Sequence, residues 1–180
     1  MQARGDNGIP PARFREAISR FATGVTVITT KRPEGPAGMT ASAVSSLSLS
    51  PLLMLVCISN RLPTHEALLE SGCFAVNVLG QGDEDLALQF ARPSEDKFAD
   101  VDVDYSSGLP VLRRAIAHFV CEVREALPGG DHSIFIGEVR HCDFIPHRRP
   151  LVYFGSKFSA LDSGDSALFE ACTWDAAMRM

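Results

Sequence analysis

Two alternating segments separated by a glycine-containing turn constrain the fold of this chain more than any other feature. Apolar and polar side chains alternate through most of residues 116–127 (IAHFVCEVREAL) and 133–145 (SIFIGEVRHCDFI). A period of two is typical of β-strands with one buried face. The turn between them, residues 128–132 (PGGDH), has two glycines that can adopt positive φ. The sequence therefore predicts a long antiparallel hairpin.

Shorter strands are predicted in the rest of the chain. β-Branched or apolar residues dominate four further segments, residues 24–31, 52–58, 73–79 and 151–154. The unbroken apolar run at 52–58 is typical of a strand that is buried on both faces. About six strands in antiparallel order indicate a mainly β barrel with short accessory helices, in preference to an alternating βαβ fold.

Three short helices are expected beside these strands. Apolar spacing predicts a helix over residues 11–21, which has proline near its first turn. A second is predicted over residues 65–72, with Thr64 as its N-cap. A third is predicted over residues 82–91, where acidic side chains in the first turn complement the helix dipole.

The composition is that of one ordinary globular domain. The chain has 180 residues, of which 46% are hydrophobic and 22% charged, so it is long enough for a single core. We expect a mobile arm at residues 1–10, one domain at 11–161 and a tail at 162–180, in which residues 166–178 could form a helix. A net charge of −5 without a basic block argues against binding to nucleic acid. Without a signal-peptide core or an apolar run of about 18 residues, we expect a cytoplasmic protein that enters no membrane.

Several common catalytic and binding motifs are absent. The glycine-rich loops G-x-G-x-x-G and G-x-x-x-x-G-K-[ST] do not occur, nor does the nucleophile motif G-x-S-x-G of α/β-hydrolases. The cysteines form no C-x-x-C pair, so we expect neither a metal site nor a disulfide framework. Their positions are Cys57, Cys73, Cys121, Cys142 and Cys172.

Residues 38–64 leave two interpretations open. The first half of this stretch is rich in Ser, Thr and Ala, and the second half is an apolar run that ends at Ser59-Asn60-Arg61. Small side chains leave main-chain N–H groups uncovered, so a flat or phosphorylated small molecule could bind there. A serine-rich edge strand facing water would have the same composition. By themselves, Arg92, Lys97 and His132 likewise fit either a site or an exposed surface.

Six segments in this order resemble the flavin reductase family. They are FATGVTVIT at residues 21–29, GMTAS at 38–42, LVCI at 55–58, FAVNVL at 74–79, KF at 97–98 and GDH at 130–132. The resemblance spans residues 11–161 and implies the fold of that family, an antiparallel six-stranded split β-barrel in Greek-key order. One departure is Ser50-Pro51-Leu52, where many relatives have Asp-Pro-Pro.

The resemblance also implies which residues form the site. The flavin contacts would be Thr40, Ala41, Ser42, Ala43, Cys57, Ile58, Ser59, Asn60, Thr64, Ala91 and Lys97. Within this set, residues 40–43 would face the flavin ring, whereas Ser59, Asn60, Thr64 and Lys97 would face its phosphate. His132 would be the catalytic-site contact of the nicotinamide, with Tyr153, Phe154 and Gly155 near it.

The activity implied by the resemblance is that of an NAD(P)H:flavin oxidoreductase. Hydride would pass from C4 of NADH, or of NADPH, to N5 of FMN or FAD, and the cofactors would supply the chemistry. Reduced flavin would then diffuse to a partner flavin-dependent monooxygenase. The family also implies a homodimer and no metal. A non-catalytic FMN-binding or electron-carrier protein on the same barrel is the alternative, and a purely structural β domain is a third.

Overall fold

The computed structural model describes residues 8–94 and 96–161. Within these residues the helices are α1 (Pro11–Ile18), α2 (Pro63–Ser71) and α3 (Glu84–Ala91). The strands are β1 (Thr23–Gly24), β2 (Thr26–Arg32), β3 (Gly35–Ala41), β4 (Val44–Leu49), β5 (Leu52–Ser59), β6 (Cys73–Val78), β7 (Val103–Asp104), β8 (Val111–Leu112), β9 (Ala117–Gly129), β10 (His132–Phe144), β11 (Val152–Phe154) and β12 (Lys157–Ser159).

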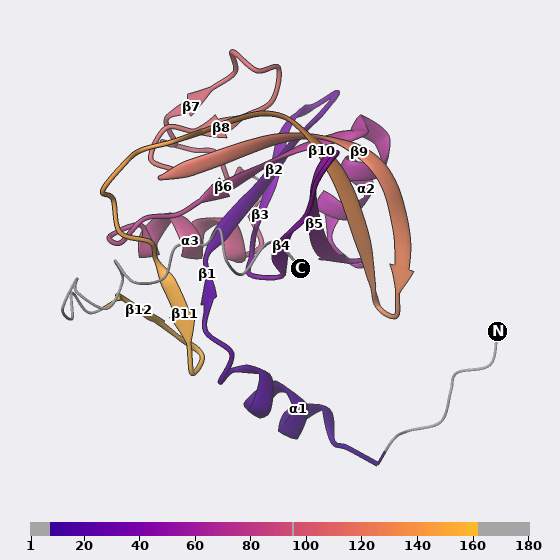
Figure 1. The fold of residues 1–180 in the computed structure, drawn as a ribbon, viewed down its shortest axis with the longest axis vertical. Coiled ribbons are helices and arrows are strands. Elements are labelled where there is room, and N and C mark those ends of the chain that lie inside the picture. Colours follow the sequence, from indigo (N-terminus) through magenta and orange to yellow (C-terminus); the bar gives the residue numbers. More distant parts are fainter. Residues whose placement is uncertain (1–7, 95, 162–180) are drawn as a thin grey trace.

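One antiparallel sheet dominates the described part of the chain. Its seven strands follow the order β3-β2-β6-β9-β10-β5-β4 (Figure 1). Five of the six predicted strands lie in this sheet, and β3 and β4 are additional to the prediction. Two small sheets, β1-β11-β12 and β7-β8, accompany it. The long hairpin is confirmed, with Ala117 opposite Phe144 at its base and Gly129 opposite His132 at its turn. The prediction of a mainly β fold with short helices is therefore confirmed.

The two outermost strands of this sheet are neighbours in the sequence. Only Ser42 and Ala43 connect the end of β3 to the start of β4. An extended chain gains at most about 3.6 Å per residue, so Ala41 and Val44 lie within about 11 Å of each other. The sheet must curl until its edges nearly meet, as its shape in Figure 1 shows. Since no described residues pair β3 with β4, the barrel is split along this seam.

Strand β2 separates two apolar cores. Ile28 packs inside the curled sheet with Phe74 and Phe135, and all three side chains are fully buried. Val27 points the other way and packs with Phe90 of α3 in a second core. Successive side chains of a strand point to opposite faces, so β2 buries both of its faces.

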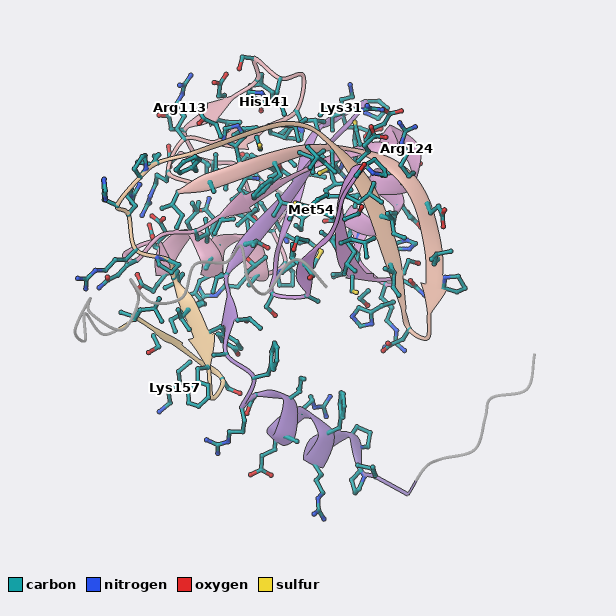
Figure 2. All side chains as sticks on the ribbon, in the orientation of Figure 1. Lys31, Met54, Arg113, Arg124, His141 and Lys157 are labelled. Carbon is teal, nitrogen blue, oxygen red and sulfur yellow. The ribbon has the colours of Figure 1, made fainter. Side chains whose placement is uncertain are left out.

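Strand β5 buries only one face. Its side chains alternate between buried and less buried, with Met54, Val56 and Ile58 on the buried side. Figure 2 shows Met54 within the curled sheet. The prediction that this strand is buried on both faces is wrong, because α2 packs mainly on β2 and α3 mainly on β3, which leaves the outer face of β5 only partly covered.

The first two helices differ from the prediction at their ends. Helix α1 ends at Ile18 instead of residue 21, and none of its side chains is buried. It projects from the barrel at the lower edge of Figure 1. The N-cap of α2 is Leu62, not Thr64, since Pro63 occupies the first helical position, where proline is favoured. Thr64 therefore lies within the first turn and is buried.

The predictions for the chain ends fall mostly outside the described residues. Most of the arm at residues 1–10 and all of the tail at 162–180, with its helix at 166–178, lie there. In the part of the chain that is described, no helix has the length and apolar character needed to span a lipid bilayer.

Candidate functional site

A cavity of about 570 Å³ lies beside β3, at one edge of the sheet. Its walls come from the β2–β3 turn, the first residues of β3, the start of α2 and the segment that follows α3. Its size is typical of a site for a small molecule. Of the flavin contacts predicted from the sequence, Thr64, Ala91 and Lys97 line this cavity.

Close packing of β3 against α3 shapes this cavity. Gly38 of β3 lines it and is buried. A Cβ atom on Gly38 would lie 2.8 Å from Cε1 of Phe90, closer than side chains tolerate. A glycine at this position therefore lets the edge strand lie directly against the helix. The carbonyl oxygen of Phe90, at the end of this helix, accepts a hydrogen bond from Lys97.

Lys97 is a half-buried ammonium in the cavity wall. Its Nζ donates a hydrogen bond of 2.8 Å to the carbonyl oxygen of Phe90, at the C-terminal end of α3. Burial lowers the pKa of Lys97 below its ordinary value, because desolvation disfavours the charged form. An ammonium has three protons, and among the described residues only the Phe90 oxygen accepts one, so two remain for an anion. Arg92, the other basic candidate, is exposed and does not line the cavity.

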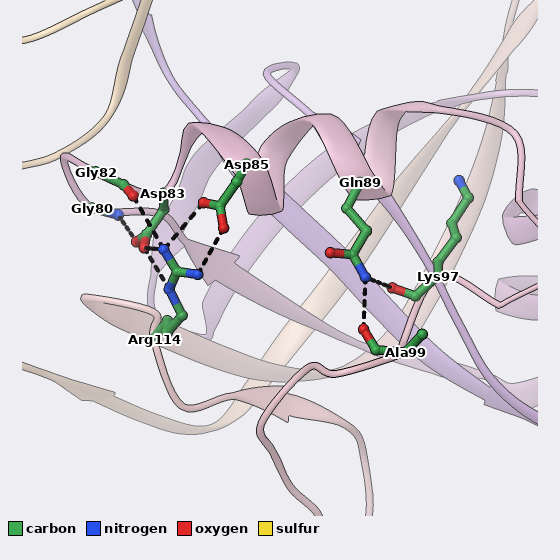
Figure 3. Close-up of polar contacts among 8 residues, drawn as sticks. All are labelled: Gly80, Gly82, Asp83, Asp85, Gln89, Lys97, Ala99 and Arg114. Atoms are coloured by element: carbon green, nitrogen blue, oxygen red, sulfur yellow. Dashed lines mark hydrogen bonds and ion pairs between the residues drawn. The ribbon is translucent and has the colours of Figure 1, made fainter.

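The backbone that carries Lys97 is held by the side chain of Gln89 (Figure 3). Gln89 Nε2 donates to the carbonyl oxygen of Lys97 at 3.1 Å and to that of Ala99 at 2.9 Å. One side chain on α3 thus fixes the segment that follows the helix. The position of the ammonium depends on this attachment.

The other end of α3 is fixed by a buried carboxylate. Asp83, which is 2% exposed, accepts a hydrogen bond of 2.9 Å from Gly80 N and one of 2.8 Å from Arg114 Nε. Arg114 also donates to both carboxylate oxygens of Asp85, as Figure 3 shows. This hydrogen bonding by Arg114 lowers the pKa of Asp85. The helix that precedes this wall of the cavity is therefore attached at both ends.

The residues predicted to face the flavin ring lie at the seam of the barrel. The hydroxyl of Thr40 donates to the carbonyl oxygen of Ala87 on α3. Ala41 is buried, whereas Ser42 and Ala43 are exposed. The carbonyl oxygen of Ala43 accepts a hydrogen bond of 2.9 Å from Cys57 N, so two segments that hold predicted flavin contacts, 40–43 and 57–60, meet here. None of these residues lines the cavity.

His132 lies at the start of β10, opposite Ser59 in the register of β5. Its Nδ1 is 2.7 Å from Asp131 Oδ1, and hydrogen bonding to His132 lowers the pKa of Asp131. Asn60 N donates to the carbonyl oxygen of Asp131 at 3.0 Å. The fold thus brings together Ser59, Asn60 and His132, three predicted residues from two distant segments.

Two residues with no signal in the sequence join this group. Ser133 Oγ donates to Asn60 Oδ1 at 3.0 Å and lies 2.8 Å from His65 Nε2. The ring of His65 packs edge-on against Phe135, with 5.4 Å between the ring centroids. The pairing of β10 with β5 brings Ser133 next to Asn60 and His65, and that pairing cannot be read from residue spacing.

Tyr153, Phe154 and Gly155 do not lie near His132 in this chain. Tyr153 pairs with Thr23 in the small sheet, and Gly155 N donates to the carbonyl oxygen of Ser19 at 2.8 Å. Figure 1 shows β11 and the β9–β10 turn on opposite sides of the lower part of the molecule. The prediction that Tyr153, Phe154 and Gly155 lie beside His132 is therefore wrong within one chain. Strand β11 pairs with β1 near α1, whereas His132 pairs with the end of β5.

A curled, mainly β sheet with a cavity that offers hydrogen-bond donors is the architecture of a small-molecule-binding barrel. The family described as "Flavin reductase like domain" matches residues 18–162. The chain belongs to this family.

The relatives of this chain are named as reductases. The chain is 40% identical over 147 residues to "4-nitrophenol 4-monooxygenase/4-nitrocatechol 2-monooxygenase, reductase component" of Rhodococcus opacus, covering 82% of this chain and 79% of that relative. It is 39% identical over 152 residues to the "NADH-dependent FAD reductase" of Streptomyces globisporus, covering 81% and 83%. The solved structure of the Streptomyces globisporus NADH:FAD oxidoreductase in complex with NAD and FAD fragments superimposes with a TM-score of 0.84 at 36% identity, covering 91% of this chain and all of that one.

Proposed function

We propose that this protein is an NADH-dependent flavin reductase that supplies reduced flavin to a partner monooxygenase. The match of the flavin reductase family to residues 18–162 is the observation that carries the proposal. The names of the relatives agree, since one is an NADH-dependent FAD reductase and another is the reductase component of a monooxygenase.

The residues of the cavity fit a flavin phosphate. The Lys97 ammonium is half-buried and has protons to donate, and the cavity also borders the first turn of α2. Helix N-termini present unpaired N–H groups and a positive dipole end to an anion. Lys97 and Thr64 would hold the phosphate, and the small residues 40–43 would let the ring lie against the main chain.

A bound flavin supplies the hydride-accepting chemistry, taking at N5 the hydride that leaves C4 of NADH. The contribution of the protein is to hold the two rings in contact, which requires about 3 to 3.5 Å between the reacting atoms. Main-chain N–H groups of residues 40–42 would stabilise negative charge on the reduced ring. His132, beside Ser59 at the end of β5, would orient the nicotinamide.

We further propose that the protein acts as a homodimer in the cytoplasm, where NADH is available. Helix α1 exposes Phe14 and Ile18, and the β11 strand exposes Tyr153 and Phe154. Exposed apolar groups of this kind are typical of interfaces. A second copy would cover them, and its own Tyr153 and Gly155 could complete the site beside His132.

Purified protein should oxidise NADH rapidly only when FMN or FAD is added, as followed by the loss of NADH absorbance. No acceleration with either flavin would reject the proposal. Stoichiometric yellow protein that does not turn over NADH would favour the non-catalytic flavin-binding alternative.

A further inference from the structure

The cavity lies outside the residues that are proposed to hold the flavin ring. Its volume of about 570 Å³ is typical of a site for a whole small ligand, yet none of residues 40–43 lines it. A ring bound at the seam would place only the tail of the flavin here. The ribityl phosphate of FMN would contact Lys97 and leave the end at the β2–β3 turn without a ligand group.

An arginine without a partner lines that far end. Arg32 is the last residue of β2 and pairs with Gly35 across the turn. Its side chain is exposed, and in the described part of the chain its guanidinium forms no hydrogen bond or ion pair. Arg113, Arg114, Arg124, Arg140 and Arg148, in contrast, all contact carboxylates or carbonyl oxygens. Arg32 is therefore free to bind a ligand.

The surroundings of Arg32 suit the second half of a dinucleotide. A guanidinium binds phosphate oxygens through two parallel hydrogen bonds. The rings of Pro36, Pro93 and Phe98 offer apolar surface for a base, and the carboxylates of Glu34 and Asp96 can accept hydrogen bonds from ribose hydroxyls. The same carboxylates repel phosphate, so the guanidinium is needed to offset their charge. FMN has neither a second phosphate nor an adenosine.

Building on the proposed function, we propose that the β2–β3 turn forms a subsite for the adenosine diphosphate half of FAD, and that Arg32 makes the protein prefer FAD to FMN. Lys97 binds the phosphate that the two flavins share. Arg32 binds the phosphate that only FAD has.

Equilibrium titrations of the full chain with FAD, FMN and riboflavin test this assignment. We expect Arg32→Gln to raise the Kd for FAD about tenfold, because the glutamine amide lacks the charge that strengthens hydrogen bonds to phosphate, and to change the Kd for FMN less than about twofold. Lys31→Gln is the matched control. Lys31, labelled in Figure 2, is the neighbouring cation on β2, does not line the cavity and points to the opposite face. It should leave all three Kd values unchanged.

The other outcomes distinguish a failure of the proposed function from a failure of the subsite assignment. Wild-type protein that binds neither flavin would reject the proposed function itself. If both flavins bind and Arg32→Gln weakens them equally, or weakens neither, the subsite assignment is wrong. An increase of the KM for NADPH without any change for FAD would likewise overturn it. Unchanged binding of FMN by the variant shows that the site remains folded.

Discussion

At the scale of single residues, Lys97 combines a charge with partial burial. Replacing it by methionine keeps the length of the side chain and removes the ammonium. We expect Lys97→Met to raise the Kd for FMN about tenfold and to leave the Kd for riboflavin, which has no phosphate, nearly unchanged. Flavin fluorescence titrations measure both values. An equal loss for both flavins would place Lys97 against the ring instead of the phosphate.

The lowered pKa of Lys97 adds a dependence on pH. The protonated form binds phosphate, so the affinity for FMN should fall as the pH rises through the pKa of this group. Because burial lowers that pKa, the fall should begin below the ordinary lysine value of about 10.4. Riboflavin affinity should not show this step.

His132 tests the proposed nicotinamide contact. Its side chain is 44% exposed and, among the described residues, its ring bonds only to Asp131, so its removal should not disturb the core. We expect His132→Ala to raise the KM for NADH more than it raises the Kd for flavin, as steady-state kinetics and flavin titration would show. Equal effects on both, or no effect on either, would reject the role. His147→Ala, at an exposed position outside the predicted site, is the control.

At the scale of elements, the attachment of α3 by Arg114 should contribute to stability. In the described part of the chain, Arg114→Met leaves the carboxylate of Asp83, which is 2% exposed, with only the Gly80 N–H. Because Arg114 itself is 46% exposed, we expect a loss of about 2 kcal/mol in the free energy of unfolding, at the low end for a broken buried pair. Urea denaturation measures it. Arg113→Met, which breaks only exposed pairs with Asp102 and Asp104, should have little effect.

The contribution of Asp85 to this attachment depends on pH. Its pKa in the folded protein is lowered by hydrogen bonding to Arg114. Its stabilising effect should therefore be complete above the ordinary aspartate pKa of about 3.9 and disappear as the pH falls through the lowered value. The stability difference between the wild type and the Arg114→Met variant should therefore become smaller at low pH, by the share that Asp85 contributes, and a constant difference down to the most acid pH would contradict this.

Several elements follow directly from residue pattern. Alternation and the glycine turn correctly predict β9 and β10. Two segments of alternating apolar and polar residues that are joined by a short turn indicate a β-hairpin. Residues 52–58 show the limit of such reasoning. Their composition fits a strand buried on both faces, but which faces are covered depends on where the helices pack.

At the scale of the whole molecule, the apolar side chains of α1 predict association. Against the described residues the helix buries none of its side chains, so the double variant Phe14→Ser, Ile18→Ser should keep its β-sheet circular dichroism. We expect sedimentation to show a dimer for the wild type and a shift toward the monomer for the variant, with a higher KM for NADH. A monomeric wild type would contradict the proposed dimer.

The sequence by itself determined the β pattern, the approximate bounds of six of the twelve described strands and, through six short segments, the resemblance to the flavin reductase family. These are local properties, set by side-chain periodicity and turn chemistry. Only the tertiary structure decided which of those segments meet. The curled sheet and the packing of Gly38 against Phe90 bring Arg32, Thr64 and Lys97 to one cavity. The same strand order separates Tyr153 from His132. Contacts between distant residues depend on sheet order and register, and no local pattern in the chain specifies them.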